Sequence, residues 1–180
     1  MNTGFNLIHL IEALNEIGDM DAPVFPHSNN YTTIENGHAT SFKDDSDNTI
    51  NIEIIQVPLN AISFVKQEKV YNMSFDVNGK DIKDENSVPY KELLKLIRTT
   101  VVIAFEFIDK HKPNGLLISA AAGTQRKTKV LNALYHSYIS NNKAEGYAWG
   151  LEHIGAIPVY YIKKEEEESD IKEMLKEIFK

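Results

Sequence analysis

The chain has 180 residues, 42% of them hydrophobic, which suffices for one domain of ordinary size with a buried core. It contains no cysteine, so disulfides and thiolate chemistry are excluded. The net charge of -7 is unevenly spread: residues 1–60 and 165–180 are acidic, whereas residues 61–164 hold more lysine and arginine than acid. This distribution fits either an ordinary solvated surface or a central region that faces an anion.

The sequence contains neither a membrane-spanning segment nor a secretory signal. No apolar run is long enough to cross a bilayer, and the N-terminus lacks a basic start and a small-residue cleavage site. We therefore expect a cytoplasmic protein without membrane association.

The first 30 residues predict an amphipathic helix followed by a linker. Residues 5–17 place an apolar residue every third or fourth position, so that one stripe forms on a helix. The stripe consists of Leu7, Leu10, Ile11, Leu14 and Ile17. Residues 19–30 contain Pro23 and Pro26 among polar residues, which is typical of a linker. The stripe would either dock on its own domain or bind a partner.

Antiparallel strands are predicted between residues 31 and 77. Asn36-Gly37 separates two short polar–apolar runs and favours a type I′ hairpin turn. Residues 49–57 and 70–77 both alternate between apolar and polar, and Asn78-Gly79 forms a second turn. The acidic loop at residues 43–48 lacks the glycine and the terminal glutamate of an EF-hand, so we interpret it as a polar turn.

Two long helices and a buried strand are predicted in the second half. Residues 89–112 are apolar around most of the helix circumference, so this helix should be buried on more than one side. Residues 115–122 form a nearly continuous apolar run, as expected of a central strand. A helix over residues 124–140 follows, and residues 146–149 and 157–162 form closing strands. The buried side of the second helix should contain Val130, Leu131, Leu134, Tyr135 and Tyr138.

The C-terminus repeats the pattern of the N-terminus. Residues 164–168 form a charged spacer, and Ser169 caps a last amphipathic helix. Its apolar stripe consists of Ile171, Met174, Leu175, Ile178 and Phe179. The stripe either packs on the parent domain or is exposed and binds a protein partner or a second copy.

The predicted fold is α+β, with a mixed, mainly antiparallel sheet, two principal helices and amphipathic helices at both termini. Residues 31–163 would form the domain. Residues 1–30 and 164–180 would be appendages to it.

Several short motifs between residues 70 and 162 carry a resemblance to known proteins. They are Lys112-Pro113, Ser119-Ala120, Arg126-Lys127-Thr128, Leu134-Tyr135 and Gly146-Tyr147. In this order they resemble small bacteriophage proteins of unassigned function, and the element order is similar to the C-terminal half of the GNAT N-acetyltransferase fold. The resemblance implies a GNAT-like topology and a protein located in the host cytoplasm or in a virion. It also implies that Tyr135 could protonate a leaving thiolate, whereas a tyrosine on an amphipathic stripe is ordinarily a core residue.

The chain departs from the GNAT family at the start of the first long helix. In the family, a Gln/Arg-x-x-Gly-x-Gly/Ala loop there binds the coenzyme A pyrophosphate through backbone N–H groups. This chain has Asn86-Ser87-Val88-Pro89 instead, without glycine and with a proline that removes one donor. We therefore expect no cofactor, and acetyl-CoA only if the site is atypical.

The best candidate binding site lies at the start of the second long helix. Thr124, Arg126, Lys127 and Lys129 follow Gly123, so cations and free helix N–H groups would meet there and could bind an anion or nucleic acid. Alternatively, the cations are solvated or pair with the acidic flanks. The six histidines show no metal-ligand spacing, so no metal site is expected.

Three functions remain open. The first is a non-catalytic structural or interaction protein, either virion-associated or host-directed, on an acetyltransferase-like scaffold. The second is an N-acyltransferase with an atypical acetyl-CoA site and Tyr135 as general acid. The third is an anion or nucleic-acid binder that uses the basic helix start.

Overall fold

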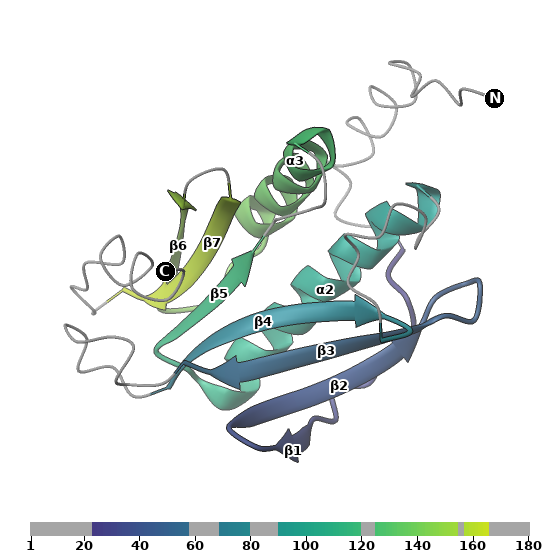
Figure 1. The fold of residues 1–180 in the computed structure, drawn as a ribbon. Helices are drawn as coiled ribbons and strands as arrows, with labels where there is room; N and C mark the ends of the chain where they lie inside the picture. The colour runs from purple at the N-terminus through teal and green to yellow at the C-terminus, as the bar shows by residue number, and fades with distance from the viewer. Residues whose placement is uncertain (1–22, 58–68, 80–89, 120–124, 155–156, 166–180) are drawn as a thin grey trace.

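The computed structural model describes residues 23–57, 69–79, 90–119, 125–154 and 157–165 of the chain. These residues form seven strands and two helices (Figure 1). In chain order they are β1 (Thr32–Ile34), β2 (Gly37–Lys43), β3 (Thr49–Gln56), β4 (Val70–Val77), α2 (Tyr90–His111), β5 (Gly115–Ser119), α3 (Gln125–Asn141), β6 (Tyr147–Ile154) and β7 (Ile157–Lys164). The predicted terminal helices, residues 5–17 and 169–180, lie outside the described residues.

All seven strands belong to one mixed sheet with the order β1-β2-β3-β4-β5-β7-β6. Every neighbouring pair is antiparallel except β4 and β5, which are parallel and are joined through α2. A parallel pair requires such a crossover connection, and α2 supplies it. The predicted α+β fold, with a mixed, mainly antiparallel sheet and two principal helices, is therefore confirmed.

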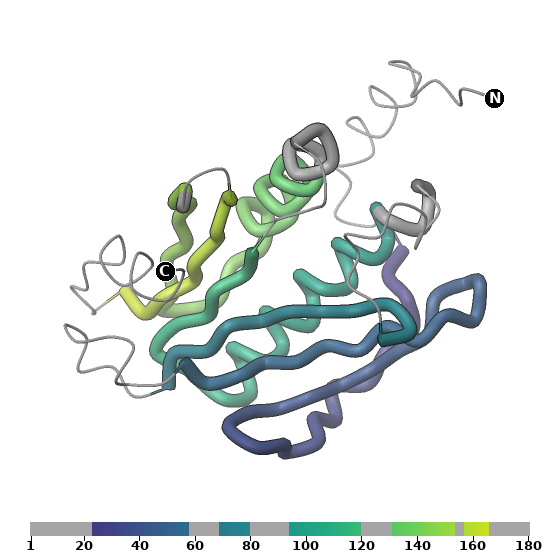
Figure 2. The backbone as a smooth tube through the Cα atoms, viewed as in Figure 1, coloured from purple at the N-terminus to yellow at the C-terminus, as the bar shows by residue number. Residues whose placement is uncertain are grey.

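Both helices cover the same face of the sheet, and the core lies between them and that face (Figure 2). The strand register places the alternating residues Ile50, Ile52 and Ile54 of β3 on this face, and each is fully buried. The predicted buried side of α3 is confirmed for Leu131, Leu134, Tyr135 and Tyr138. On the opposite face, β1 to β4 carry mostly polar side chains.

Helix α2 is buried on two sides. Leu96, Ile103 and Phe107, which broaden its apolar stripe, are all 0% exposed. One side faces the sheet, and the other contacts residues 23–31, which we call the strap. The strap includes the last part of the predicted linker, yet Phe25 is also 0% exposed and belongs to the core. The broad apolar circumference of α2 therefore reflects cover by two different parts of the chain.

The first hairpin forms as predicted, but its turn is displaced by one residue. Ile34 pairs with Gly37, so the two connecting residues are Glu35 and Asn36, and Asn36 has a φ of 61°. Gly37 begins β2 and needs no positive φ. A Cβ atom at Gly37 would lie 2.3 Å from the carbonyl oxygen of Ile54, so glycine permits the close approach of two strands.

Candidate functional site

The predicted anion site falls largely outside the described residues. Arg126, Lys127 and Lys129 lie in the first turns of α3, which contain no acidic residue. Their side chains and the whole of Thr124 are not described. The same holds for the C-terminal stripe at Ile171, Met174, Leu175, Ile178 and Phe179. Both sites therefore remain predictions.

Tyr135 lies on the buried side of α3 and is 1% exposed. Its ring is 6.1 Å from the ring of Tyr160, measured between centroids. The Tyr160 hydroxyl is hydrogen-bonded to the carbonyl and side-chain oxygens of Asn132, at 2.8 and 2.6 Å. The Tyr135 hydroxyl, by contrast, is buried and has no hydrogen-bond partner among the described residues. Burial also raises the pKa of Tyr135, which keeps the phenol protonated.

The parallel strands β4 and β5 separate before β4 ends. They pair from Val70 with Gly115 to Met73 with Ile118, and β4 then continues to Val77. On that side of β4, the last four residues have no strand partner in the described part of the sheet. Figure 1 shows the two strands diverging toward their C-terminal ends. We call this region the β4–β5 wedge. Open sheets commonly bind ligands at the carboxyl ends of parallel strands, and the wedge has that position.

Strand β6 forms one edge of the sheet along its full length. It pairs with β7 without interruption, from Tyr147 with Lys164 to Ile154 with Ile157. No described residue pairs with its other side. Natural edge strands are commonly short or protected by proline, lysine or a bulge. The opposite edge, β1, has only three residues, whereas β6 is eight residues long, regular and without proline or lysine. An edge with these properties can pair with another strand.

Aromatic side chains accompany this edge on the helix-covered face. The Trp149 ring packs edge-on against the His136 ring of α3, with 5.3 Å between centroids, and lies 6.4 Å from the Tyr160 ring. Trp149 and Leu151 are both half-buried and occupy the same face of β6. The Tyr147 hydroxyl donates to the carbonyl of Pro113 at 2.6 Å. Tyr147 and Trp149 therefore pack on one face of β6, and Trp149 borders this sheet edge.

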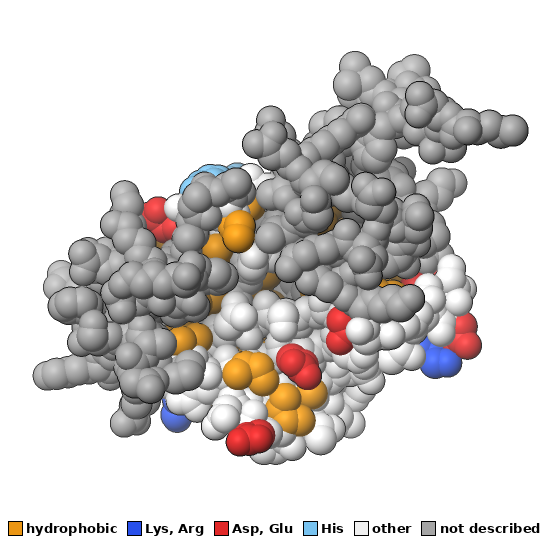
Figure 3. Space-filling view, viewed as in Figure 1, with side chains coloured by type: hydrophobic (Ala, Val, Ile, Leu, Met, Phe, Trp, Pro, Cys, Tyr) orange, Lys and Arg blue, Asp and Glu red, His pale blue; other side chains and the backbone are white. Residues whose placement is uncertain are grey.

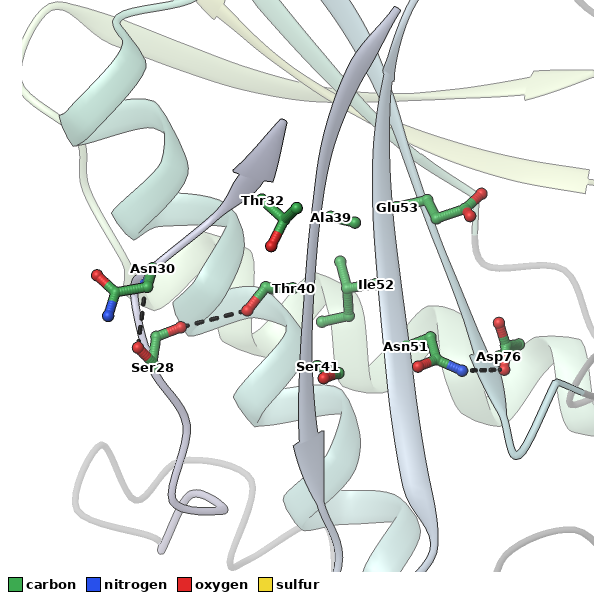
Figure 4. Close-up of a pocket in the computed structure, with 10 residues that line it drawn as sticks. All are labelled: Ser28, Asn30, Thr32, Ala39, Thr40, Ser41, Asn51, Ile52, Glu53 and Asp76. Carbon is green, nitrogen blue, oxygen red and sulfur yellow. Dashed lines mark hydrogen bonds between the residues drawn. The ribbon is translucent and has the colours of Figure 1, made fainter. Parts of the chain in front are cut away.

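A polar hollow of about 390 Å³ lies on the face of the sheet opposite the helices. It is lined by Ser28, Asn30, Thr32, Ala39, Thr40, Ser41, Asn51, Ile52, Glu53 and Asp76 (Figure 4). Asn51 donates to the Asp76 carboxylate at 2.9 Å, and Thr40 donates to the Ser28 carbonyl at 3.3 Å. Figure 3 shows acidic side chains on this face beside a small apolar group. Because its ionisable lining residues are acidic, the hollow does not suit an anion.

The sequence did not reveal that two distant histidines meet. The rings of His38 on β2 and His111 at the end of α2 lie 4.4 Å apart, measured between centroids. Contacts between residues so far apart leave no spacing pattern in a sequence. No group of three potential metal ligands forms among the described side chains. None of the helices in the described part of the chain is long and apolar enough to cross a membrane.

Comparison with known protein families, with curated proteins and with solved structures finds no match to this chain.

Proposed function

We propose that the chain is a structural protein that self-associates through β6 and is built on a GNAT-like scaffold. The observation that carries this proposal is the edge of β6, with which no described residue pairs. The strand order supports the scaffold: one parallel pair, β4 and β5, is connected by α2, and β7 lies between β5 and β6. These are the elements that the resemblance to acetyltransferases implies. A virion-associated or host-directed protein would use such an edge for assembly.

The residues of β6 are compatible with antiparallel pairing of two copies about a two-fold axis. With Leu151 on the axis, Leu151 would face Leu151 of the second copy, and Trp149 would face His153. On the other side of the sheet, Gly150 would face Glu152. Cross-strand pairs of apolar and aromatic residues stabilise sheets, and this register brings no like charges together. A two-fold axis also limits the assembly to a closed dimer.

Sedimentation of the full chain over a range of concentrations tests this proposal. We expect a monomer–dimer equilibrium. Successive N–H groups of a strand point to opposite edges, so Glu152→Pro and His153→Pro form a matched pair. The variant in which proline replaces a residue with an outward-pointing N–H should abolish the dimer with little loss of stability. The variant in which proline replaces a residue whose N–H points to β7 loses a hydrogen bond within the sheet, so it should mainly lower the melting temperature. A strictly monomeric wild type, or a dimer that survives in both variants, contradicts the proposal.

A second candidate function is the binding of an acyl thioester in the β4–β5 wedge. On the β5 side, residues 74–77 have no strand partner among the described residues, so their backbone groups could bind the amide-bearing pantetheine arm of coenzyme A. The Tyr135 hydroxyl, which has no hydrogen-bond partner among the described residues, adds a buried proton donor on α3. Isothermal titration with acetyl-CoA tests this function. Heat of binding together with NMR shifts at residues 74–77 would support it, whereas no binding would reject it and leave the β6 proposal unaffected.

A further inference from the structure

The strap is fixed to α2 by contacts that follow one side of the helix. The backbone N–H of Phe25 donates to Thr99 Oγ1 of α2 at 2.9 Å, while the Phe25 ring stacks on Phe42 of β2 with 5.7 Å between centroids. Further along the strap, the Tyr31 hydroxyl donates to the carbonyl of Ile103 at 3.1 Å. The strap therefore lies along the helix before the chain enters β1.

Ionisable groups provide three more contacts between the strap and α2. His27 Nε2 lies 3.3 Å from the Glu106 carboxylate, and this contact is an ion pair when the imidazole is protonated. Lys110 Nζ donates to the carbonyl of Asn29 at 2.9 Å. Lys110 also lies 5.4 Å from the centroid of the Tyr31 ring. The far end of the strap is thus held next to the C-terminal turn of α2.

Aromatic and histidine rings from four elements meet at that end. His111 stacks on Phe107 at 4.5 Å and lies 4.4 Å from His38, both measured between ring centroids. The Tyr31 ring contacts His111 edge-on at 5.4 Å, and Tyr71 of β4 contacts His38 at 6.1 Å. The strap, β2, β4 and α2 are therefore joined through one ring cluster that contains two imidazoles.

The surroundings of His111 disfavour a positive charge. Burial is the largest cause of its lowered pKa, and His38 and Lys110 lower it further. His111 Nε2 is buried and has no hydrogen-bond partner among the described residues. The nearby carboxylate on α2, Glu106, contacts His27 instead, and burial together with Glu106 raises the pKa of Tyr31, so its phenol stays neutral. A proton on His111 would thus be placed among neutral rings, His38 and Lys110.

We propose that His38 and His111 form an acid-sensitive latch that holds the strap and β1 against the end of α2. When the His111 ring is neutral, it packs as an aromatic side chain. Protonation of His111 puts a charge into the half-buried ring cluster beside His38 and Lys110, which loosens the strap and β1 but leaves strands β2 to β7 paired. Release of the strap would free residues 23–31 for another contact.

The direction of the pH dependence follows from the shift at His111. A histidine whose folded-state pKa is lowered contributes stability that is present above its unfolded pKa of about 6.5 and is lost as the pH falls through that range. We therefore expect amide exchange in residues 24–39 to accelerate at least about tenfold, relative to β3 and β7, between about pH 8 and about pH 5 after correction for intrinsic exchange.

Replacement by phenylalanine separates titration from packing, because the ring is retained and the charge is not. His111→Phe should flatten the pH dependence of exchange in the strap. His136→Phe is the matched control, because His136 is exposed on α3 and its ring contacts Trp149 and Tyr160 rather than the cluster, and it should keep the wild-type profile.

The latch is overturned if strap exchange in the wild type does not accelerate on acidification beyond that of β3. It is also overturned if the folded His111→Phe variant keeps the wild-type pH profile. NMR titration of the His111 ring in the wild type provides a test that needs no variant. Its midpoint should coincide with that of strap release, and two well-separated midpoints contradict the proposal.

Discussion

The backbone N–H of Phe25 donates a hydrogen bond to the hydroxyl of Thr99, and this bond fixes the position at which the strap meets α2. The Thr99 hydroxyl in turn donates to the carbonyl of Lys95 at 2.7 Å. Thr99→Val keeps the shape of the side chain but leaves the buried Phe25 N–H without an acceptor. We predict a loss of about 1–3 kcal/mol in the free energy of unfolding, measured by urea denaturation.

Thr100→Val is the matched control for this prediction. The Thr100 hydroxyl is equally buried, but it only donates to the carbonyl of Leu96 within the same helix. Its removal leaves no buried donor unpaired, so we expect little change in stability. Equal effects of the two substitutions would show that the bond to the strap contributes nothing.

The described elements were largely predictable because their signals are periodic. The alternation of Ile50, Ile52 and Ile54 indicated β3, and the apolar circumference of residues 89–112 indicated a doubly covered helix. The strap was not predictable, because one buried phenylalanine between two prolines has no period. The contact between His38 and His111 was missed for the same reason: it depends on the sheet order rather than on sequence spacing.

Gly37 in the first hairpin permits the close approach of two strands, whereas the Asn36-Gly37 pair had suggested a turn residue with a positive φ. Gly37→Ala would place its Cβ 2.3 Å from the Ile54 carbonyl oxygen, and backbone atoms cannot move aside cheaply. We predict a loss of about 1–3 kcal/mol in the free energy of unfolding, from denaturant titration. Gly79→Asn serves as the control, because Gly79 has a φ of 75° and open space around it, and asparagine tolerates that conformation. An unchanged midpoint for Gly37→Ala would refute the close approach.

Loss of the hydroxyl group should lower the stability at one of two neighbouring core tyrosines but not at the other. Tyr160→Phe removes the hydrogen bonds to Asn132 and should cost about 0.5–1.5 kcal/mol. Tyr135→Phe removes a buried hydroxyl without a described partner, so thermal unfolding should be unchanged or shifted upward. A clear destabilisation by Tyr135→Phe would instead reveal a partner for that hydroxyl.

Buried tyrosines also make the protein sensitive to alkali. Burial raises the pKa of Tyr160 to about 12, and it raises the pKa of Tyr135 as well. A group whose folded-state pKa is raised contributes stability below its unfolded pKa of about 10 and loses it as the pH rises further. We predict that the urea midpoint falls above about pH 10 and that phenolate absorbance appears together with unfolding. Complete ionisation of tyrosine near its ordinary pKa in the folded protein would contradict this.

Disulfide trapping along β6 tests the proposed self-association most directly. The chain has no cysteine, so each single cysteine introduced over residues 147–154 would be its only thiol. Facing residues at an antiparallel two-fold axis lie close enough to be linked, whereas residues further from the axis face different residues. We predict covalent dimers with a maximum at Leu151→Cys and little cross-linking for His136→Cys on α3. Absence of a maximum along β6, or equal cross-linking at His136, would contradict assembly through this edge.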